Sequence, residues 1–221
     1  MENCKIKNLY NLEETIAKSL LEDLTYPWEA LSKISEFIIQ LGKNLDNEIY
    51  ELKGENIWIA KSANIAPTAY IKGPAIIGEN AEIRHCAFIR GNAIVGNNAV
   101  VGNSTELKNV ILFNKVQVPH YNYVGDSILG YKAHMGAGSI TSNVKSDKTL
   151  VIVKDGAEKF ETSLKKFGAM IGDNVEVGCN SVLNPGTVVG RNSNIYPLSC
   201  VRGVVPANSI YKKQNEIVCK K

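Results

Sequence analysis

The stretch IKGPAIIGENAEIRHCAFIRGNAIVG, residues 71–96, carries an aliphatic side chain at every sixth position. Isoleucine stands at positions 71, 77, 83 and 89, valine stands at 95, and alanine follows each of them four places later. Outward from this stretch, the same period starts at Ile59 and runs to Phe113. A second run starts at Ile171 and ends at Val201. Apolar residues at ten consecutive sixth positions, from 59 to 113, are not accidental, so the period reflects the fold.

A period of six is typical of a parallel β-helix, in which short strands joined by tight corners form triangular coils that stack on one another. Each buried isoleucine or valine contributes about 1.5–3 kcal/mol against chain entropy, so a stack of coils is stable where one coil is not. Strands of a β-sandwich alternate with period two and would not produce a period of six. The sequence therefore predicts a mainly β fold, with the β-helix in residues 56–206.

The first 55 residues follow a different pattern. Asn11 with Glu14 three places later is typical of a helix start, and apolar residues then recur at spacing four. Pro27 opens a second apolar stripe that ends at Gly42. We predict that residues 1–55 form two short amphipathic helices that pack on each other and on the first coils.

Residues 143–168 leave the six-residue period between its two runs. The segment TLVIVKDGAEKFETS is typical of a β-hairpin that turns at Asp155 and Gly156. We predict that this hairpin is inserted into the β-helix and projects from it, and that residues 207–221 form a C-terminal tail.

Composition and charge narrow the classes of function. The sequence has no run of 18 apolar residues and no secretory signal at its N-terminus, so we expect a cytoplasmic protein with no membrane partner. Residues 1–55 hold 6 basic and 11 acidic side chains, whereas the rest of the chain holds 19 basic and 11 acidic ones. The larger part is basic, which suits a phosphorylated small molecule or a coenzyme. Without an arginine cluster or interleaved aromatic residues, we expect no nucleic-acid partner.

The period breaks near the middle of the chain. Counted on from the first run, it would place Pro119 and Gly125 at inward strand positions, which suit neither residue, and it resumes at Leu129 in a shifted register. We therefore expect an irregular loop at residues 119–128. This segment suggests a functional site, although insertions accumulated without any function would also explain it. Its polar and titratable residues are His120, Tyr121, Asn122, Tyr123 and Asp126.

Arg90 and Lys108 are 18 residues apart, and each directly follows an inward aliphatic residue. In a β-helix of three hexapeptides a coil, they should stack one above the other about 5 Å apart, where like charges repel. A bound anion would relieve this repulsion. Two solvated surface charges are the alternative.

The three histidines, His85, His120 and His134, raise the alternative of a metal site. Some hexapeptide proteins are carbonic anhydrases that hold zinc with three histidines between subunits. That family has an H-x-x-x-x-H pair, which this sequence lacks, so we expect no metal.

The segment HYNYVGDSILG, which starts at His120, is followed by GAGSITSN, which ends at Asn143. Together they resemble the acetyltransferase domain of bifunctional UDP-N-acetylglucosamine pyrophosphorylase/glucosamine-1-phosphate N-acetyltransferases and of related sugar-1-phosphate nucleotidylyltransferases. The likeness runs from about residue 56 to residue 206. It implies a left-handed parallel β-helix, a homotrimer with its active sites in the clefts between subunits, and acetyl-CoA as co-substrate.

The resemblance also implies roles for individual residues, and no metal is required for them. His120 would be the general base, Arg90 and Lys108 would hold the sugar phosphate, Tyr123 and Asn143 would contact the sugar, and the backbone N–H of Ala137 would meet the thioester carbonyl.

The sequence departs from the family at several positions. His134 stands where the family has an asparagine, and a further family lysine matches either Lys145 or Lys148. Residues 1–55 hold only two glycines and no glycine-rich nucleotide loop, so we expect no pyrophosphorylase domain.

Two functions follow from these motifs. The first is an acetyl-CoA-dependent N-acetyltransferase that acts on an amino-sugar 1-phosphate resembling glucosamine 1-phosphate. The alternative is a non-catalytic hexapeptide-repeat trimer that scaffolds or partners a separate nucleotidyltransferase through its N-terminal helices.

Overall fold

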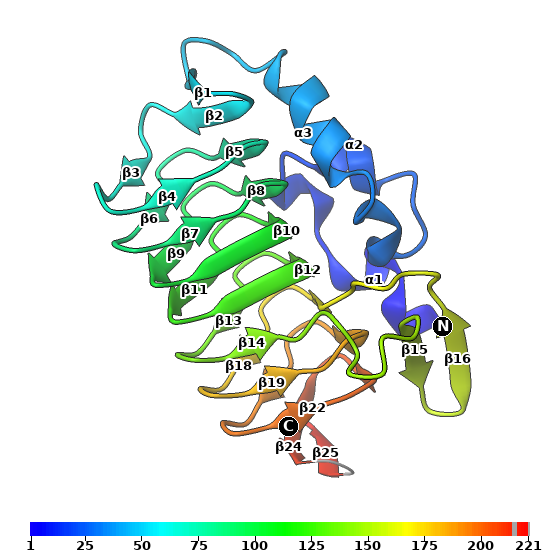
Figure 1. Ribbon diagram of the computed structural model, residues 1–221. Helices are drawn as coiled ribbons and strands as arrows, with labels where there is room; N and C mark the ends of the chain where they lie inside the picture. The colour runs from blue at the N-terminus through cyan, green and yellow to red at the C-terminus, as the bar shows by residue number, and fades with distance from the viewer. Residues whose placement is uncertain (214–215, 221) are drawn as a thin grey trace.

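The computed structural model describes residues 1–213 and 216–220, and it confirms the predicted parallel β-helix with an N-terminal helical segment and an inserted hairpin (Figure 1). Successive coils pair in parallel, with Cα partners 17 or 18 residues apart on most of the prism. Two sheets form its walls, one with fourteen strands and one with nine.

The prism has three sides, which we number by their order in each coil. The first side contains β2 (Ile57–Ala60), β5 (Ala75–Ile77), β8 (Ala93–Val95), β17 (Ala169–Ile171), β20 (Thr187–Val189) and β23 (Val204–Val205). The second side contains β3 (Asn64–Ile65), β6 (Glu82–Ile83), β9 (Val100–Asn103), β11 (Gln117–His120), β13 (His134–Met135), β18 (Glu176–Val177), β21 (Asn194–Ile195) and β24 (Ser209–Lys213). The third side contains β4 (Tyr70–Ile71), β7 (Phe88–Ile89), β14 (Ile140–Thr141), β19 (Val182–Leu183) and β22 (Cys200–Val201).

Two longer strands, β10 (Glu106–Leu112) and β12 (Tyr123–Leu129), turn a corner and belong to the third and first sides together. Two further strands close the ends of the prism. At one end β1 (Tyr50–Gly54) pairs antiparallel with β2, and at the other β25 (Glu216–Cys219) pairs antiparallel with β24.

The interior of the prism consists of the periodic residues that the sequence identifies, except that Leu112 takes the inward place predicted for Phe113, whose ring lies 5.1 Å from that of Tyr10 in the N-terminal segment. Ile77, Ile83, Ile89, Val101 and Leu107 are at most 1% exposed, and so are the alanines that follow four residues after most inward positions. The first inward residues of the stack, at positions 59, 65 and 71, are only half-buried because the prism ends there. The stacked aliphatic columns are therefore the hydrophobic core of the β-helix.

The expected irregular loop at residues 119–128 is wrong. The register shift begins one coil earlier, where Leu107 pairs with Ile89 but Leu112 pairs with Val95. The first side of that coil is thus spanned by five residues instead of six.

The first side is shortened again in the next coil, where Val124 and Leu129 are also five residues apart, so the inward positions move by one residue after Leu107 and by a second residue after Val124. Val118 and Val124 point inward in place of Pro119 and Gly125, and both valines are fully buried. The corner between β11 and β12 is formed at Tyr121, whose φ is +51°. The segment is a regular turn of the prism, so its polar residues are held by strands.

The N-terminal segment, residues 1–49, packs along the length of the first side, beside β5, β8, β10 and β12 (Figure 1). The two helices predicted for it are broken into shorter pieces: η1 (Glu2–Cys4), α1 (Ile6–Leu9), η2 (Leu12–Glu14), α2 (Lys18–Leu21), η3 (Pro27–Ala30) and α3 (Ile34–Gly42). Asn11 caps η2 as predicted, but through the amide of Glu13, while Glu14 accepts from Asn114 of the prism. The segment therefore lies against the middle of the prism as well as its first coils.

The inserted hairpin is confirmed, with β15 (Ile152–Asp155) and β16 (Glu158–Glu161) joined by a two-residue turn at Gly156, whose φ is +58°. It projects from the prism and contacts the N-terminal segment, where the rings of Tyr26 and Phe160 lie 4.9 Å apart. None of the helices in the described part of the chain is long and apolar enough to cross a bilayer.

Candidate active site

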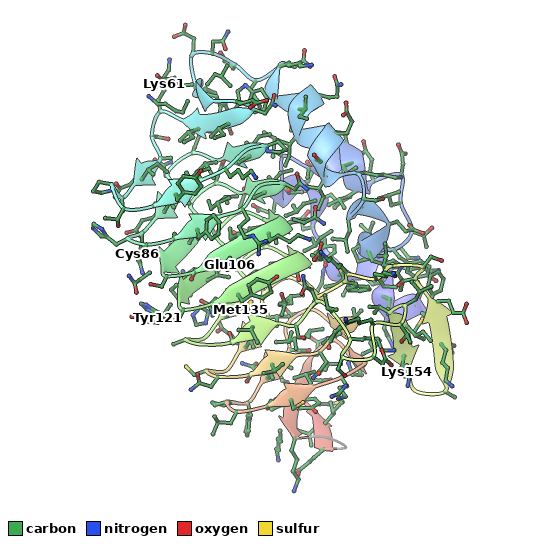
Figure 2. The ribbon with its side chains drawn as sticks, viewed as in Figure 1. Lys61, Cys86, Glu106, Tyr121, Met135 and Lys154 are labelled. Carbon is green, nitrogen blue, oxygen red and sulfur yellow. The ribbon has the colours of Figure 1, made fainter. Side chains whose placement is uncertain are left out.

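His120 is the last residue of β11 and lies at the corner between the second and third sides, with its side chain exposed. Its backbone carbonyl accepts a hydrogen bond from the amide of Gly138 at 3.0 Å, so the turn that carries Ala137 lies directly beside it in the next coil. Figure 2 shows the neighbouring Tyr121 at this edge of the prism. The structure thus brings together the predicted general base and the predicted thioester-binding amide.

Asn122 fastens these two turns to each other. It is 2% exposed; its Oδ1 accepts from the amide of His120, and its Nδ2 donates to the carbonyls of Gly136 and Ser139 at 2.9 and 3.0 Å. From the sequence, Asn122 was only one member of the expected loop. Because a buried amide with all these partners cannot move freely, Asn122 holds the His120 corner and the Ala137 turn in register.

The backbone N–H of Ala137 has no hydrogen-bond acceptor among the described residues. The Ala137 carbonyl accepts from the amide of Asn180 at 2.8 Å. An N–H without an internal partner at an accessible turn is the kind of group that stabilises a developing oxyanion.

Arg90 and Lys108 stack on adjacent coils as predicted, since Ile89 pairs with Leu107. Each cation already has a carboxylate partner. Arg90 Nη1 lies 2.7 Å from Glu106 Oε1, and Lys108 Nζ lies 2.7 and 2.9 Å from the two oxygens of Asp126. The repulsion between the two cations is therefore relieved within the chain, and the inference of an anion from repulsion alone does not hold.

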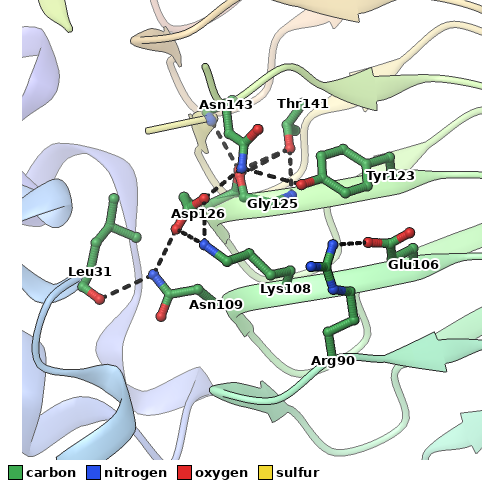
Figure 3. A network of polar contacts seen from close by, with 12 residues as sticks. Leu31, Arg90, Glu106, Lys108, Asn109, Tyr123, Gly125, Asp126, Thr141 and Asn143 are labelled. Carbon is green, nitrogen blue, oxygen red and sulfur yellow. Dashed lines mark hydrogen bonds and ion pairs between the residues drawn. The ribbon is translucent and has the colours of Figure 1, made fainter. Parts of the chain in front are cut away.

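Asp126 is the centre of a polar network on this part of the prism (Figure 3). The residue is 3% exposed, and besides Lys108 it accepts from Asn109 Nδ2 at 3.0 Å and Asn143 Nδ2 at 2.5 Å. Asn109 also donates to the carbonyl of Leu31 in the N-terminal segment at 3.1 Å. The network thus joins Lys108, a predicted phosphate contact, and Asn143, a predicted sugar contact, to a carboxylate that the sequence placed in a candidate site without a specific role.

Tyr123 lies on β12 beside this network, and its hydroxyl oxygen accepts from Asn143 Nδ2 at 3.2 Å. Burial raises the pKa of Tyr123, and the charges of Asp126 and Glu106 raise that pKa further. The phenol therefore remains protonated at neutral pH and keeps a hydrogen to donate. The hydrogen bond to Glu106 and its charge likewise raise the pKa of Arg90.

The six predicted site residues form two groups. His120 and Ala137 lie at one corner, while Lys108, Tyr123 and Asn143 meet around Asp126, with Arg90 beside them on the third side. Strand β12 connects the groups, because it begins three residues after His120. Within residues 1–213 and 216–220, no hydrogen bond joins the His120 ring to the second group.

The residues that depart from the family pattern lie elsewhere. The Nδ1 atom of His134 is 2.7 Å from Glu176 on the second side. Lys145 contacts Asp147 and Thr149 within its own loop, and Lys148 is exposed. His85, an exposed corner residue as expected, contacts Thr68 at 2.9 Å. In the described ranges, no three His, Cys, Asp or Glu side chains are grouped as a metal site.

Comparison with known proteins agrees with this architecture. The family model "GMPPB C-terminal domain" matches residues 71–157, and the model "Bacterial transferase hexapeptide (six repeats)" matches residues 168–203. The "Bifunctional protein GlmU" of Methanococcus maripaludis strain C5 is 35% identical, with 90% of this chain and 49% of that protein covered. The protein of the same description from Methanocaldococcus jannaschii is 32% identical with the same coverage.

This chain is similar over most of its length to proteins described as GlmU, and it contains hexapeptide repeats. A third relative, "Bifunctional sugar-1-phosphate nucleotidylyltransferase/acetyltransferase" of Sulfurisphaera tokodaii, is 31% identical over 51% of this chain and 28% of that protein. The GlmU proteins match about nine tenths of this chain, and the chain spans about half of their length. The resemblance inferred from its two sequence motifs is confirmed.

Proposed function

We propose that the protein is an acetyl-CoA-dependent N-acetyltransferase that acts on an amino-sugar 1-phosphate. The observation that carries this proposal is the pairing of the His120 and Ala137 turns, joined by the hydrogen bond from Gly138 and by the buried amide of Asn122. A base and a free N–H at one accessible corner are the two groups that acyl transfer to an amine requires.

The reaction then needs only acid–base and positioning chemistry from the chain. The amine of the sugar attacks the thioester carbonyl, the new C–N bond forms, and the C–S bond breaks as coenzyme A leaves. His120 accepts the amine proton and returns it to the leaving thiolate, since an imidazole exchanges protons near neutral pH. The N–H of Ala137 stabilises the oxyanion, and the contact between amine and thioester supplies further acceleration.

The Asp126 network supports the choice of a phosphorylated sugar. Arg90 and Lys108 place two cations on the third side, and Tyr123 and Asn143 offer hydrogen-bonding groups beside them. The ion pair of Arg90 with Glu106 is partly exposed, with side chains 46% and 33% accessible, so it holds these two groups only weakly. An incoming phosphate dianion would displace Glu106 and take its place on Arg90.

A homotrimer is part of the proposal, because a cleft between copies would place a second wall against the His120 corner. Exposed aromatic side chains lie at this corner and along the third side: Tyr121 is 65% exposed, and Tyr70, three coils away, is 63% exposed with its ring 5.8 Å from that of Phe88. Contact with a second copy would cover them. Light scattering would then give three times the chain mass of 24.2 kDa.

The test is transfer of a ¹³C-labelled acetyl group from acetyl-CoA to a panel of acceptors, followed by mass spectrometry of the products. The panel contains glucosamine 1-phosphate, galactosamine 1-phosphate, glucosamine 6-phosphate and free glucosamine. Mass detection is preferable to a thiol reagent, because the chain has exposed free cysteines at positions 86, 179, 200 and 219. We expect acetylation of a 1-phosphate acceptor and little transfer to free glucosamine.

His85 supplies a matched control for the proposed base, because it is an exposed histidine at the same corner two coils away. His120→Gln should lower kcat by about 10²- to 10⁴-fold, whereas His85→Gln should leave kcat unchanged. Equal rates in the two variants would refute the assignment of the base. No transfer to any acceptor by an intact trimer would favour the scaffolding alternative.

A further inference from the structure

Asp126 is a buried carboxylate whose donors in the described chain are all side chains. Its side chain is 5% exposed and accepts from Lys108, Asn109 and Asn143. A buried negative charge is strongly unfavourable unless it is paired and hydrogen-bonded, so these three donors are bound firmly to this position. The φ of Asp126 is +47°, a left-handed conformation that turns the carboxylate into the network at the shortened side.

Asp126 decides which atoms of Asn143 remain available. The Nδ2 group of Asn143 donates to Asp126 Oδ2 and to the hydroxyl oxygen of Tyr123, which uses both of its hydrogens. The Oδ1 atom of Asn143 is left as an acceptor, and the hydroxyl hydrogen of Tyr123 is left as a donor. The carboxylate therefore fixes a pattern of one acceptor and one donor next to the Lys108 ammonium.

Asp126 also removes the conformational freedom of Lys108. A free lysine side chain populates many rotamers, and a bound ligand must overcome this entropy when it orders the side chain. The two contacts of 2.7 and 2.9 Å order Lys108 before any ligand arrives. Unlike Glu106, which has one donor and is partly exposed, Asp126 is too deeply buried to be displaced by a phosphate.

Asn109 links this carboxylate to the N-terminal segment. Its Nδ2 group donates to Asp126 Oδ1 and to the carbonyl of Leu31, which lies between η3 and α3. The main-chain position of Leu31 is fixed in turn by the packing of its side chain, which is 4% exposed. Through Asn109 and Asp126, the N-terminal segment thus helps to orient Lys108 and Asn143, the proposed substrate contacts.

We propose that Asp126 is a positioning residue that holds Lys108 and Asn143 in their binding orientation, and that Asn109 couples it to the N-terminal segment at Leu31. This inference rests on the proposed function, since the ligand it serves is the amino-sugar phosphate. The N-terminal segment then acts as part of the substrate site without touching the substrate.

The test compares Asp126→Asn with Asp173→Asn, because Asp173 is a buried carboxylate of similar exposure that has no contact with the proposed site. We expect Asp126→Asn to raise the KM for the amino-sugar 1-phosphate at least tenfold and to change the KM for acetyl-CoA less than twofold. Asn109→Gly, which keeps the left-handed φ of +56°, should raise the same KM about three- to tenfold. Asp173→Asn should change neither KM.

A second readout is independent of catalysis. In ¹H–¹⁵N spectra, the side-chain amide signals of Asn109 and Asn143 should move in Asp126→Asn and stay in place in Asp173→Asn. If wild type acetylates nothing while these signals move, the proposed function fails and the positioning by Asp126 stands. If the Asn143 signal stays in place, or if the KM values of Asp126→Asn and Asp173→Asn change alike, the positioning role is overturned whatever the activity.

Discussion

Asp126 and Asp173 are two buried carboxylates that secure the same N-terminal segment along the two edges of the first side. In the described chain, the Asp126 carboxylate accepts from side chains, those of Lys108, Asn109 and Asn143. Asp173 accepts hydrogen bonds from the backbone amides of Asn11 and Tyr131 at 2.7 and 2.8 Å, and it forms an ion pair with the guanidinium of Arg191 at 3.2 Å.

The difference lies in what the donors can do besides holding the carboxylate. A backbone N–H is consumed by its single hydrogen bond, so Asp173 is a clamp between the N-terminal segment and the prism. Lysine and asparagine side chains have further hydrogen-bonding groups, so those of Lys108 and Asn143 can bind a ligand while Asp126 keeps them in place. The same buried residue type therefore serves structure at one edge and, in our proposal, the site at the other.

The largest expected effect comes from removing the cation that neutralises Asp126. Lys108→Met should lower the free energy of unfolding by about 3–5 kcal/mol, because it leaves a buried carboxylate without its charged partner. Urea unfolding would measure this loss. The double variant Lys108→Met/Asp126→Asn should recover most of the stability but none of the substrate binding.

The partly exposed pair on the adjacent coil provides the control. Arg90→Met should cost less than about 1 kcal/mol, because both side chains of the Arg90–Glu106 pair are accessible to water. A cost for Arg90→Met as large as that for Lys108→Met would show that burial does not distinguish the two pairs.

The next effect concerns the link between Asp126 and the N-terminal segment. Asn109→Gly should cost about 2 kcal/mol, because two buried hydrogen bonds are lost and glycine adds backbone entropy to the unfolded chain. Hydrogen exchange should accelerate around Leu31 and α3 but not around Asn11. Uniform acceleration over both places would mean that the two edges of the first side are not held independently.

A smaller loss is expected at the other carboxylate. Arg191→Met should cost about 1–2 kcal/mol, because Asp173 retains both backbone donors and because the buried Nε of Arg191 already lacks a partner in the described structure. Thermal unfolding of this variant beside Lys108→Met gives the comparison. If the two variants lose equal stability, backbone donors do not protect Asp173 in the way we infer.

The smallest effect is a dependence of stability on pH. Burial raises the pKa of Asp173 above its ordinary value of 3.8, against the opposing effect of its hydrogen-bond donors. Because the native state then holds this proton more tightly than the unfolded state, the stabilisation is complete below pH 3.8 and is lost as pH rises through the raised native pKa. As pH rises through this window, the free energy of unfolding of the wild type should fall relative to that of Asp173→Asn. A relative rise with pH would contradict the raised native pKa of Asp173.

The positions of the two aspartates show how much of the fold was predictable from the sequence. Both follow an aliphatic residue and a glycine, as VGD at 124–126 and IGD at 171–173. The first stands on a side shortened to five residues and adopts a positive φ, whereas the second stands on a side of ordinary length. The six-residue count detected the shift of register but placed all of it at residues 119–128, although the first residue is already missing between Leu107 and Leu112. A missing residue becomes visible in the sequence only when the next expected inward position holds an unsuitable residue.

The stacking of Arg90 and Lys108 followed from spacing, but their partners did not. Glu106 stands two residues before Lys108 and pairs with Arg90 of the coil above, while Asp126 pairs with Lys108 from the coil below. The charge count along the sequence therefore did not reveal either ion pair, because both join residues of adjacent coils. Asn122 was similarly overlooked because its importance lies in bonds to the following coil.

By itself, the sequence determined the prism and the projecting hairpin, because side chains six residues apart recur at the same depth in most of the coils. The tertiary structure alone decided how the N-terminal segment covers the first side and which groups surround Lys108. Those contacts join residues 78 and 100 positions apart, as in Asn109 with Leu31 and Asn114 with Glu14. A six-residue repeat determines the path of the backbone within each coil. The partners of a buried charge depend instead on which distant segments pack beside it in the folded chain.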